Sequence, residues 1–406
     1  MKKNFLWAMV AATVLMSCNP DKDLTEGQDQ VGEGNAVRFS TYVNKSRAGV
    51  TDTDHIKLHG FGVNAYYTRH LGFVKADGAD SLVTFMDNTK VSFNNEKGSW
   101  TYSPVKYWPN TENDKVSFFA YAPYNNAQIE FPDANNRSTL VFNVNSDVKQ
   151  QVDLVYHKGE GDEDAGIEPS IDLQKPTITG AVNFNFLHAL SRIAFNVKAV
   201  VDDVNADSDN LLDGNTHINI KKVALVSADV NYKYDESDLV GPFYTSDTLN
   251  ILNGKWGHND EQALQGFDFD GENFYRAVDI NASSDIENDD VVQLTKFNPA
   301  QRLLNDDSYL MIIPQDFTGT EGYRIYIEYD VVTEAIDNNG TEENITSDAS
   351  TISHKIYSDV MNTKFEAGKA YVFNLRLGMT SVKFDANVSD WPAEEEADNW
   401  TPENNI

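Results

Sequence analysis

Hydrophobic and polar residues alternate along much of this chain. In residues 37–43 the apolar-facing series is Val37, Phe39, Thr41 and Val43. The same period of two recurs in residues 182–186, 193–197, 323–329, 371–377 and 382–388. Because successive side chains of a strand point to opposite faces of a sheet, each segment predicts a strand with one buried face.

Clusters of Asn, Asp and Gly separate these segments at 94–98, 133–136 and 337–340, as expected for turns. Only residues 188–192 and 301–304 have a brief helical character. Parallel strands need long crossovers that are usually helical, and the pattern predicts none. The predicted fold is therefore all-β, with antiparallel sheets packed as sandwiches.

Composition and charge narrow the function classes. The 406 residues are 40% hydrophobic and 11% aromatic, which is enough for packed cores and too much for a disordered chain. Asp and Glu number 63 against 32 Lys and Arg, for a net charge of -31. A surface this negative repels phosphate backbones and excludes nucleic acid as a partner. It also repels an anionic membrane face unless a covalent anchor is present.

The N-terminus predicts such an anchor. Lys2 and Lys3 precede an apolar run over residues 5–16, which is too short to span a membrane but fits a signal peptide. The run ends at Leu15-Met16-Ser17-Cys18, which resembles a bacterial lipobox. In such signals the cysteine becomes the first residue and carries acyl chains, palmitate among them. Cys18 is the chain's one cysteine, so an intrachain disulfide is excluded and lipidation is predicted.

The chain divides by composition into five segments. Residues 1–17 are predicted as a lipoprotein signal peptide, 18–35 as an acidic flexible tether and 392–406 as an acidic tail. Between them we expect an N-terminal β-sandwich domain over 36–176 and a C-terminal one over 177–391. The boundary follows an acidic stretch at 159–172 and precedes the strand pattern at Val182. A long acidic insert within the first domain is the alternative.

Motifs for chemistry are missing from the sequence. It contains no G-x-S-x-G elbow, no phosphate-binding glycine loop and no H-E-x-x-H. His55 and His59 are four residues apart, but Gly60 and Gly62 favour a strand there, on which the two would not share a face. Acidic loops offer oxygen ligands without matching a calcium-loop pattern. We predict no enzyme, no cofactor and no metal-ligating residue.

Several dispersed motifs resemble one known family. They are WTYSPVKYWP at 100–109 with KVSFFAYAP at 115–123, FNFLHALSRIAF at 184–195, LMIIPQ at 310–315 and FEAGKAYVFNL at 365–375. Together, and in this order, they resemble the fimbrillin-like (Mfa-like) proteins of the Bacteroidetes, which build type V pili. The resemblance implies two tandem β-sandwich domains, often called transthyretin-like, and export as a lipoprotein to the cell outer membrane.

The resemblance also implies a function and a processing site. The expected function is a structural or adhesive subunit of a surface fimbria, with other fimbrial subunits as partners and a host or bacterial surface ligand as a further one. Similar fimbrillins are cut after an arginine in this region, which implies cleavage between Arg47 and Ala48 and loss of the first strand. Another subunit's strand would then fill the gap by β-augmentation.

Two questions stay open from the sequence alone. The strand with Val382, Phe384, Ala386 and Val388 has the alternation of a donor, but it equally fits a strand that completes its own sandwich. The alternative function is a lipid-anchored binding module for a glycan or host ligand that does not polymerise, with Trp100, Tyr102, Tyr107 and Trp108 as a possible platform for stacking sugar rings. The stalk, tip or base position in a pilus is not specified.

Overall fold

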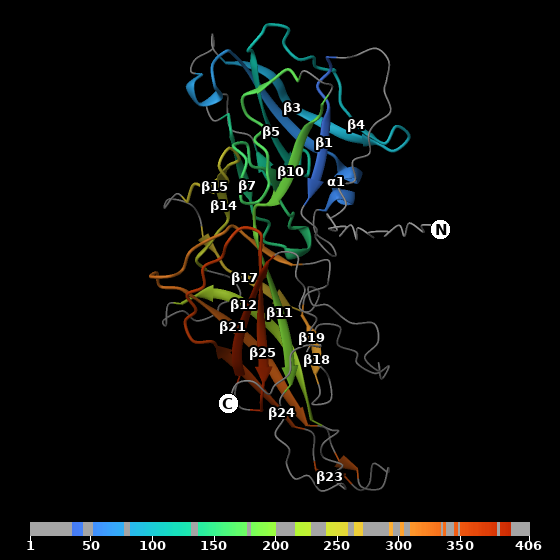
Figure 1. Ribbon diagram of the computed structural model, residues 1–406. Helices are drawn as coiled ribbons and strands as arrows, with labels where there is room; N and C mark the ends of the chain where they lie inside the picture. Colours follow the sequence, from blue (N-terminus) through green and yellow to red (C-terminus); the bar gives the residue numbers. More distant parts are fainter. Residues whose placement is uncertain are drawn as a thin grey trace, which may run out of the picture.

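The computed structural model describes residues 35–43, 52–76, 82–130, 137–176, 180–199, 216–228, 241–258, 264–270, 292–294, 301–303, 309–333, 336–337, 345–347, 350–379 and 382–390. These residues form an elongated molecule of β-sheets, with the early strands at one end and the late strands at the other (Figure 1). Every alternating segment predicted above is a strand. The all-β prediction is confirmed.

The first sheet has eight strands in the order β1-β10-β8-β5-β2-β3-β4, with β9 paired to β5. The strands are β1 (Phe39–Val43), β2 (Phe61–Arg69), β3 (Val83–Asn94), β4 (Ser99–Thr101), β5 (Lys115–Ala122), β8 (Val155–His157), β9 (Leu173–Gln174) and β10 (Val182–His188). β1 lies at one edge of this sheet, and β10 is its neighbour.

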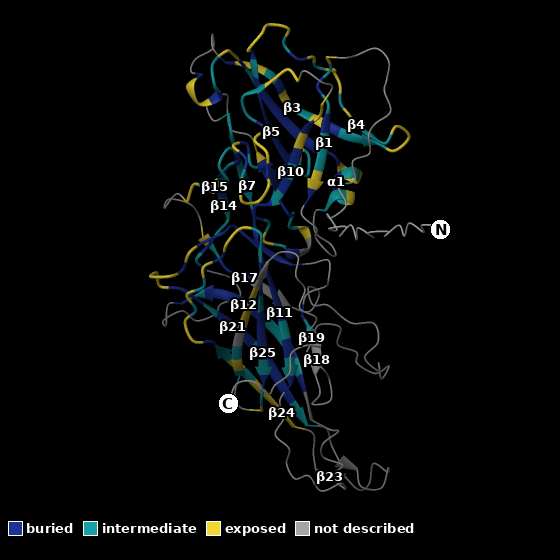
Figure 2. Ribbon diagram, in the orientation of Figure 1, coloured by how far each residue is buried: buried dark blue, intermediate teal, exposed yellow. Residues whose placement is uncertain are grey.

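Both faces of this sheet are covered, as β5 illustrates. On β5, Phe118 belongs to a core formed by one face of the sheet, while its neighbour Phe119 belongs to the core on the other face. A strand buried on both sides reads as a continuous apolar run, which is why the KVSFFAYA sequence of β5 does not alternate. Figure 2 shows the central strands of this sheet in the dark blue of buried residues.

Two five-stranded sheets form the other end of the molecule. The first has the order β19-β11-β25-β26, with β20 paired to β11; the second has the order β17-β12-β21-β24, with β18 paired to β12. Their bounds are β11 (Ser191–Ala199), β12 (Thr216–Ser227), β17 (Phe267–Asp270), β18 (Val292–Leu294), β19 (Gln301–Arg302), β20 (Leu310–Ile312), β21 (Tyr323–Thr333), β24 (Ser350–Tyr357), β25 (Lys369–Leu377) and β26 (Val382–Asp390). Inward residues of both sheets, such as Phe195 and Ile325, belong to one shared hydrophobic core.

Three smaller sheets complete the described strands. A four-stranded sheet has the order β15-β14-β7-β6, and two-stranded sheets pair β13 with β16 and β22 with β23. Their bounds are β6 (Ile129–Glu130), β7 (Thr139–Asn143), β13 (Phe243–Tyr244), β14 (Ser246–Asn250), β15 (Lys255–Trp256), β16 (Leu264–Gln265), β22 (Ile336–Asp337) and β23 (Ile345–Ser347).

The sheets do not divide at residue 176. β10 lies beyond that residue, yet it pairs with β1 and β8 of the first sheet. β14 lies further along the chain and pairs with β7, from before the predicted boundary. The acidic stretch at 159–172 marked a change in composition, whereas the strands on either side of it share one sheet.

Two strand pairs depart from the expectation of antiparallel sheets. β1 is parallel to β10, with Phe39 opposite Val182 and Val43 opposite Phe186. β11 is parallel to β25, with Arg192 opposite Ala370. The partners in each pair are far apart in sequence, and several other strands lie between them along the chain.

Helix is confined to short segments of the described chain. α1 (Thr53–His59) begins at Asp52, whose carboxylate accepts from His55 N at 2.7 Å, and ends at Gly60 with φ 79°. Two 3-10 turns lie at η1 (Phe73–Lys75) and η2 (Val148–Gln150). The helical character expected at 188–192 and 301–304 is wrong for the described residues, which belong to β10, β11 and β19 or to the bends beside them. Over the described ranges, no helix has the length and hydropathy to cross a membrane.

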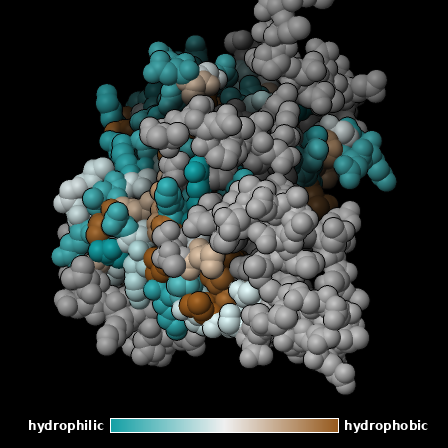
Figure 3. All heavy atoms as spheres, turned by 90° about the horizontal axis from the view of Figure 1, so that it is seen from below, coloured by the Kyte–Doolittle hydropathy of each residue, from teal (hydrophilic) through white to brown (hydrophobic). Residues whose placement is uncertain are grey.

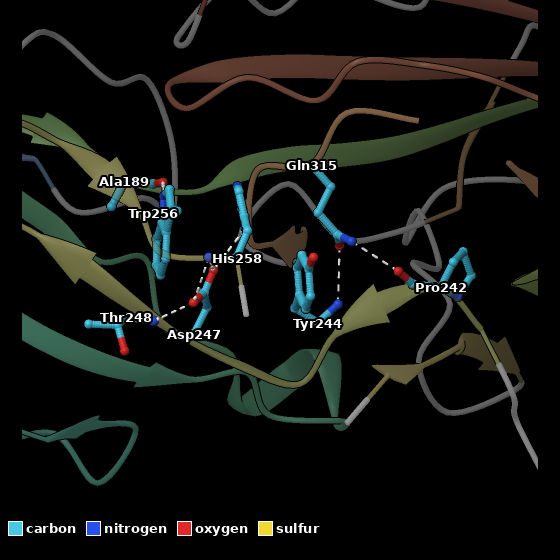
Figure 4. A network of polar contacts seen from close by, with 8 residues as sticks. All are labelled: Ala189, Pro242, Tyr244, Asp247, Thr248, Trp256, His258 and Gln315. Atoms are coloured by element: carbon cyan, nitrogen blue, oxygen red, sulfur yellow. Dashed lines mark hydrogen bonds and ion pairs between the residues drawn. The ribbon is translucent and has the colours of Figure 1, made fainter. Parts of the chain in front are cut away.

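A polar network joins the β14–β15 hairpin to the late sheets (Figure 4). The Asp247 carboxylate is fully buried and accepts from Thr248 N at 2.6 Å and His258 N at 3.0 Å, with His258 Nδ1 at 2.9 Å. Trp256 Nε1 donates to Ala189 O at 3.1 Å, in the turn between β10 and β11. These bonds satisfy a buried carboxylate and hold the hairpin against the point where the chain leaves the first sheet.

Candidate functional site

The predicted lipidation and cleavage residues lie outside the described chain. This holds for Cys18, Arg47 and Ala48. The described residues on either side of the cleavage position are nevertheless close together, because Val43 N lies 3.3 Å from Thr53 Oγ1 as a hydrogen-bond donor. The site can therefore be built from β1, which ends before Arg47, and from the residues that surround β1.

β1 is an edge strand with a deeply buried inner face. Val37, Phe39 and Val43 are 2%, 6% and 2% exposed, whereas Tyr42 on the outer face is 39% exposed. The three buried residues belong to the core formed by β2, β3, β5, β8 and β10. An edge strand held by one ladder and three buried side chains can leave without breaking the order of the remaining strands.

Phe39 lies at the centre of an aromatic cluster. Its ring stacks on Phe184 of β10 at 5.4 Å and 23°, and it meets Phe61 and Phe118 edge-on at 6.2 and 5.9 Å. Tyr102 lies 5.3 Å away. Aromatic pairs in these geometries stabilise beyond the area that they bury. If β1 were removed, an aromatic-lined gap would remain beside β10.

The residues just before β1 contact the WTYSPVKYWP motif. Val37 N donates to Lys106 O at 2.9 Å, and Trp108 N donates to Asn35 O at 2.9 Å. Tyr102 Oη donates to Val37 O at 2.8 Å. The motif thus clamps the segment that leads into β1 against the core. The sequence analysis gave no indication of this contact, which joins residues 65 positions apart.

The aromatic residues of that motif do not form an exposed platform. Trp108 is 5% exposed, and Trp100 packs edge-on against Phe61 at 4.9 Å. Of the four aromatics in the motif, Tyr107 is the exposed one, at 48%. Because stacking a sugar ring needs an accessible aromatic face, the described geometry gives no support to a glycan platform at this motif.

Seen from below, the described surface at the far end is largely hydrophilic with small hydrophobic spots (Figure 3).

The candidate donor strand β26 lies at an edge of its own sheet. It pairs antiparallel with β25, with Phe384 opposite Leu375 and Val388 opposite Tyr371. Phe384 and Val382 are partly buried against the core, but Ala386 is exposed and Val388 is 59% exposed. In this single chain β26 therefore completes its own sheet, with a weakly buried second half.

His55 and His59 do share a face, contrary to the sequence argument. They lie on α1 with 4.3 Å between ring centroids, because Gly60 ends the helix and the strand begins only after it. Burial lowers the pKa of His55, and the neighbouring His59 lowers it further. A metal site needs more ligands, and among the described residues no group of three or more His, Cys, Asp or Glu is arranged to hold a metal ion.

His157 lies on β8, the strand next to β10. It is fully buried on β8, and its Nδ1 accepts from Asn185 N of β10 at 3.1 Å. Burial lowers the pKa of His157 to about 4, so the ring is neutral at pH 7. A neutral imidazole that accepts from a backbone N–H has a structural role.

Comparisons with known proteins agree with this architecture. A family model described as fimbrillin-like matches residues 47–391, so that β1 lies before the matched segment. The fimbrium subunit Fim1C of Phocaeicola vulgatus is 26% identical over 425 aligned residues, which cover 96% of this chain and 97% of that protein. The crystal structure of a fimbrial protein from Bacteroides vulgatus has a TM-score of 0.63 at 22% identity, and the alignment covers 88% of this chain and 99% of that one. The structural likeness shows a shared fold, and the family match over most of the length shows that the chain belongs to the fimbrillin-like family.

Proposed function

We propose that this chain is a subunit of a cell-surface fimbria that is exported as a lipoprotein, anchored in the outer membrane through Cys18, and assembled by strand exchange. Cleavage between Arg47 and Ala48 would release β1 and start assembly. The family and the fimbrium subunit among its relatives support the general function. The finer mechanism is supported by the position of β1.

The single observation that carries this proposal is that β1 is both an edge strand and a core strand. It pairs with β10 alone among the described strands, yet Phe39 packs within a cluster of four aromatic rings from β2, β5, β10 and the clamp motif. Loss of β1 would leave β10 with an unpaired row of backbone groups next to an apolar gap. Such an edge is a template for a strand from another chain.

Before cleavage, β1 blocks the binding of a second chain. While β1 is in place, the β10 edge is paired and the aromatic gap is filled, so a second chain has nothing to bind there. Export of an inactive monomer followed by proteolysis at the surface would keep assembly away from the periplasm. This order of events requires that cleavage, and not folding, controls growth.

The binding-module alternative lacks a comparable observation. Most of the aromatic side chains that suggested a glycan platform pack in the core or contact the residues before β1. A surface ligand of the assembled fimbria is still compatible with the proposal.

The test is to replace Arg47 with Ala in the full chain expressed in its host. We expect Arg47→Ala to give a folded, lipidated monomer that does not enter fibres seen by electron microscopy. Lys45→Ala removes a nearby positive charge without removing the arginine, so it should assemble normally. Assembly of the Arg47→Ala variant, or recovery of peptides spanning Arg47–Ala48 from mature fibres, would contradict the mechanism. Antibody labelling along the shaft or at one end of the fibre would show whether the subunit belongs to the stalk or to an end of the pilus.

A further inference from the structure

We infer that His55 and His59, on one face of α1, form a binding site for a divalent transition-metal ion such as Zn²⁺. The two imidazoles supply two of the ligands and water supplies the others, since no group of three protein ligands is present among the described residues. The site is therefore open to solvent. The inference goes beyond the proposed function, because this binding requires neither cleavage nor assembly.

The two histidines have the spacing of a metal-binding pair on a helix. Both belong to α1, and helical residues four apart lie on the same face, one turn from each other. Zinc proteases hold their metal with two histidines at this spacing. The residues between them here are Ile56, Lys57 and Leu58, which include no glutamate to act as a general base. The pair therefore fits binding of an ion and not hydrolysis.

The rings are already close enough to share one ion. Their centroids lie 4.3 Å apart, with 46° between the ring planes. Imidazole nitrogens bind Zn²⁺ at about 2.0–2.1 Å, which puts the centroids of two rings on one ion roughly 5 Å apart. A small rotation about the side-chain bonds therefore brings both rings to a common ion.

One nitrogen of the pair is buried without a hydrogen bond. His55 Nδ1 has no hydrogen-bond partner among the described residues. Buried polar atoms of folded proteins are nearly always satisfied, and an exception calls for a water molecule or an ion. A cation bound at this nitrogen would satisfy it.

The charges around His55 also suit a cation. Burial and the neighbouring His59 lower the pKa of His55, so the ring is neutral at pH 7 and its lone pair is available to a metal. The carboxylates of Asp52 and Asp153 act in the opposite direction on this pKa, because negative charge nearby favours a positive charge at the ring. The same negative charge would attract a bound ion.

α1 holds the two side chains on a fixed backbone. Asp52 accepts from His55 N in the first turn, and Gly60 N donates to Ile56 O at 2.7 Å in the last. Ile56 is 1% exposed and belongs to the core that β1 helps to form. Ligands held on a rigid element lose little conformational freedom when they bind an ion.

A bound ion would in turn stabilise α1. A helix this short is unstable on its own and depends on its contacts, among them the bond from Val43 N of β1 to Thr53 Oγ1 at 3.3 Å. An ion that joins two successive turns favours the helical state by mass action. After loss of β1 it would keep α1 folded without that neighbour. This consequence rests on the proposed function, whereas the binding itself does not.

Binding can be measured on the untagged full chain by isothermal titration calorimetry with Zn²⁺ in buffer that contains excess Mg²⁺. Mg²⁺ prefers oxygen ligands, so it occupies the acidic surface without competing for imidazole. We expect one Zn²⁺ ion per chain, bound at least about tenfold more weakly by His59→Ala, because loss of one ligand removes the chelate. His70→Ala removes an exposed histidine outside α1 and should bind as the wild type does. The single thiol, at Cys18, is the same in every variant.

A swap within α1 tests the geometry of the pair. Lys57→His with His59→Lys keeps the composition of the helix, but residues two apart do not share a helix face. Lys57 makes an exposed ion pair with Asp54 at 3.5 Å, so little packing is lost. The far-UV circular dichroism spectrum checks that the variant is folded. It should bind Zn²⁺ as weakly as His59→Ala does.

Each outcome decides the inference. Weakened binding in His59→Ala and in the swap, with wild-type binding in His70→Ala, supports it. Electron paramagnetic resonance of the Cu²⁺-loaded chain should show two imidazole nitrogens on the ion in the wild type and one in His59→Ala. Equal affinity of the wild type and either α1 variant would place the ion elsewhere, and no binding in excess Mg²⁺ would remove the site; both overturn the inference. Strand exchange is tested separately, by the Arg47→Ala variant.

Discussion

Phe39 stacks on Phe184 with 5.4 Å between ring centroids and 23° between ring planes. The two rings belong to parallel neighbours, β1 and β10, that are more than a hundred residues apart. Phe39 lies on the strand expected to leave, and Phe184 on the strand expected to stay. Their contact is therefore expected to stabilise the uncleaved monomer and to be absent from the assembled fibre.

We expect Phe39→Ala to destabilise the uncleaved monomer by about 3–5 kcal/mol, because it removes a buried ring from an aromatic cluster. Urea unfolding of the purified monomer measures this change. Fibres assembled from the cleaved variant should have wild-type stability, because the altered residue has gone. Tyr42→Ala, on the 39%-exposed outer face of the same strand, should change stability by at most about 0.5 kcal/mol. Equal losses in monomer and fibre would show that β1 is retained.

Val388→Asp should separate folding from assembly. Val388 is 59% exposed on β26, so an aspartate there changes the stability of the monomer little. If β26 is the donor strand that fills the gap left by β1, the same residue becomes buried in the fibre, where an unpaired charge is strongly unfavourable. We expect normal monomer yield and melting temperature, with fibre growth reduced at least tenfold in a sedimentation assay.

The control for that variant is Asn387→Asp, which adds the same charge one residue earlier on the outward face. It should assemble at a rate close to wild type. If both variants assemble equally well, β26 does not enter the gap left by β1. If both fail, the charge acts through general repulsion between acidic subunits.

The sequence predicted the strands well where one face is buried. Residues 37–43 and 382–388 alternate cleanly, and both are strands. Period-two alternation contains no information on the direction of a neighbour, so the parallel pairing of β1 with β10 was not predictable from it. The boundary near residue 177 stays a prediction, and composition alone does not say which sheet a following strand joins.

The sequence around residues 52–60 contains start and stop signals for the helix α1. Asp52 caps the helix and Gly60 ends it, which is the expected pair of start and stop residues. Gly60 and Gly62 also favour a strand, but that strand begins only at Phe61. The clamp between Tyr102 and Val37 had no local signal, since it depends on a tertiary contact between distant segments.

Cys18→Ala should release the protein from the membrane fraction or block its maturation. The reason is that the lipobox at residues 15–18 has one thiol that can be acylated, and the chain has no other cysteine. Metabolic labelling with a fatty acid and membrane fractionation measure the effect. Ser17→Ala preserves the cysteine and a small residue before it, so acylation should persist. Unchanged fractionation together with unchanged labelling of Cys18→Ala would refute the anchor.

The uncleaved monomer should lose stability on mild acidification through His157. Burial lowers the pKa of this ring from 6.5 to about 4 in the folded chain. Between those values the unfolded chain binds a proton that the folded chain does not, so stability is complete above pH 6.5 and falls as the pH approaches 4. The expected loss is on the order of 3 kcal/mol, measured as the free energy of unfolding in urea across this range.

His157→Asn isolates this contribution from that of the many carboxylates. The amide oxygen of Asn can accept from Asn185 N much as Nδ1 does at 3.1 Å, but it does not titrate. The variant will be less stable at pH 7, because a smaller side chain leaves a cavity next to Phe184, whose ring centroid lies 5.3 Å from that of His157. Its stability should nevertheless change less than that of the wild type between pH 6.5 and 4. Parallel pH profiles for the two proteins would show that His157 is protonated without cost in the folded chain, contrary to its burial next to β10.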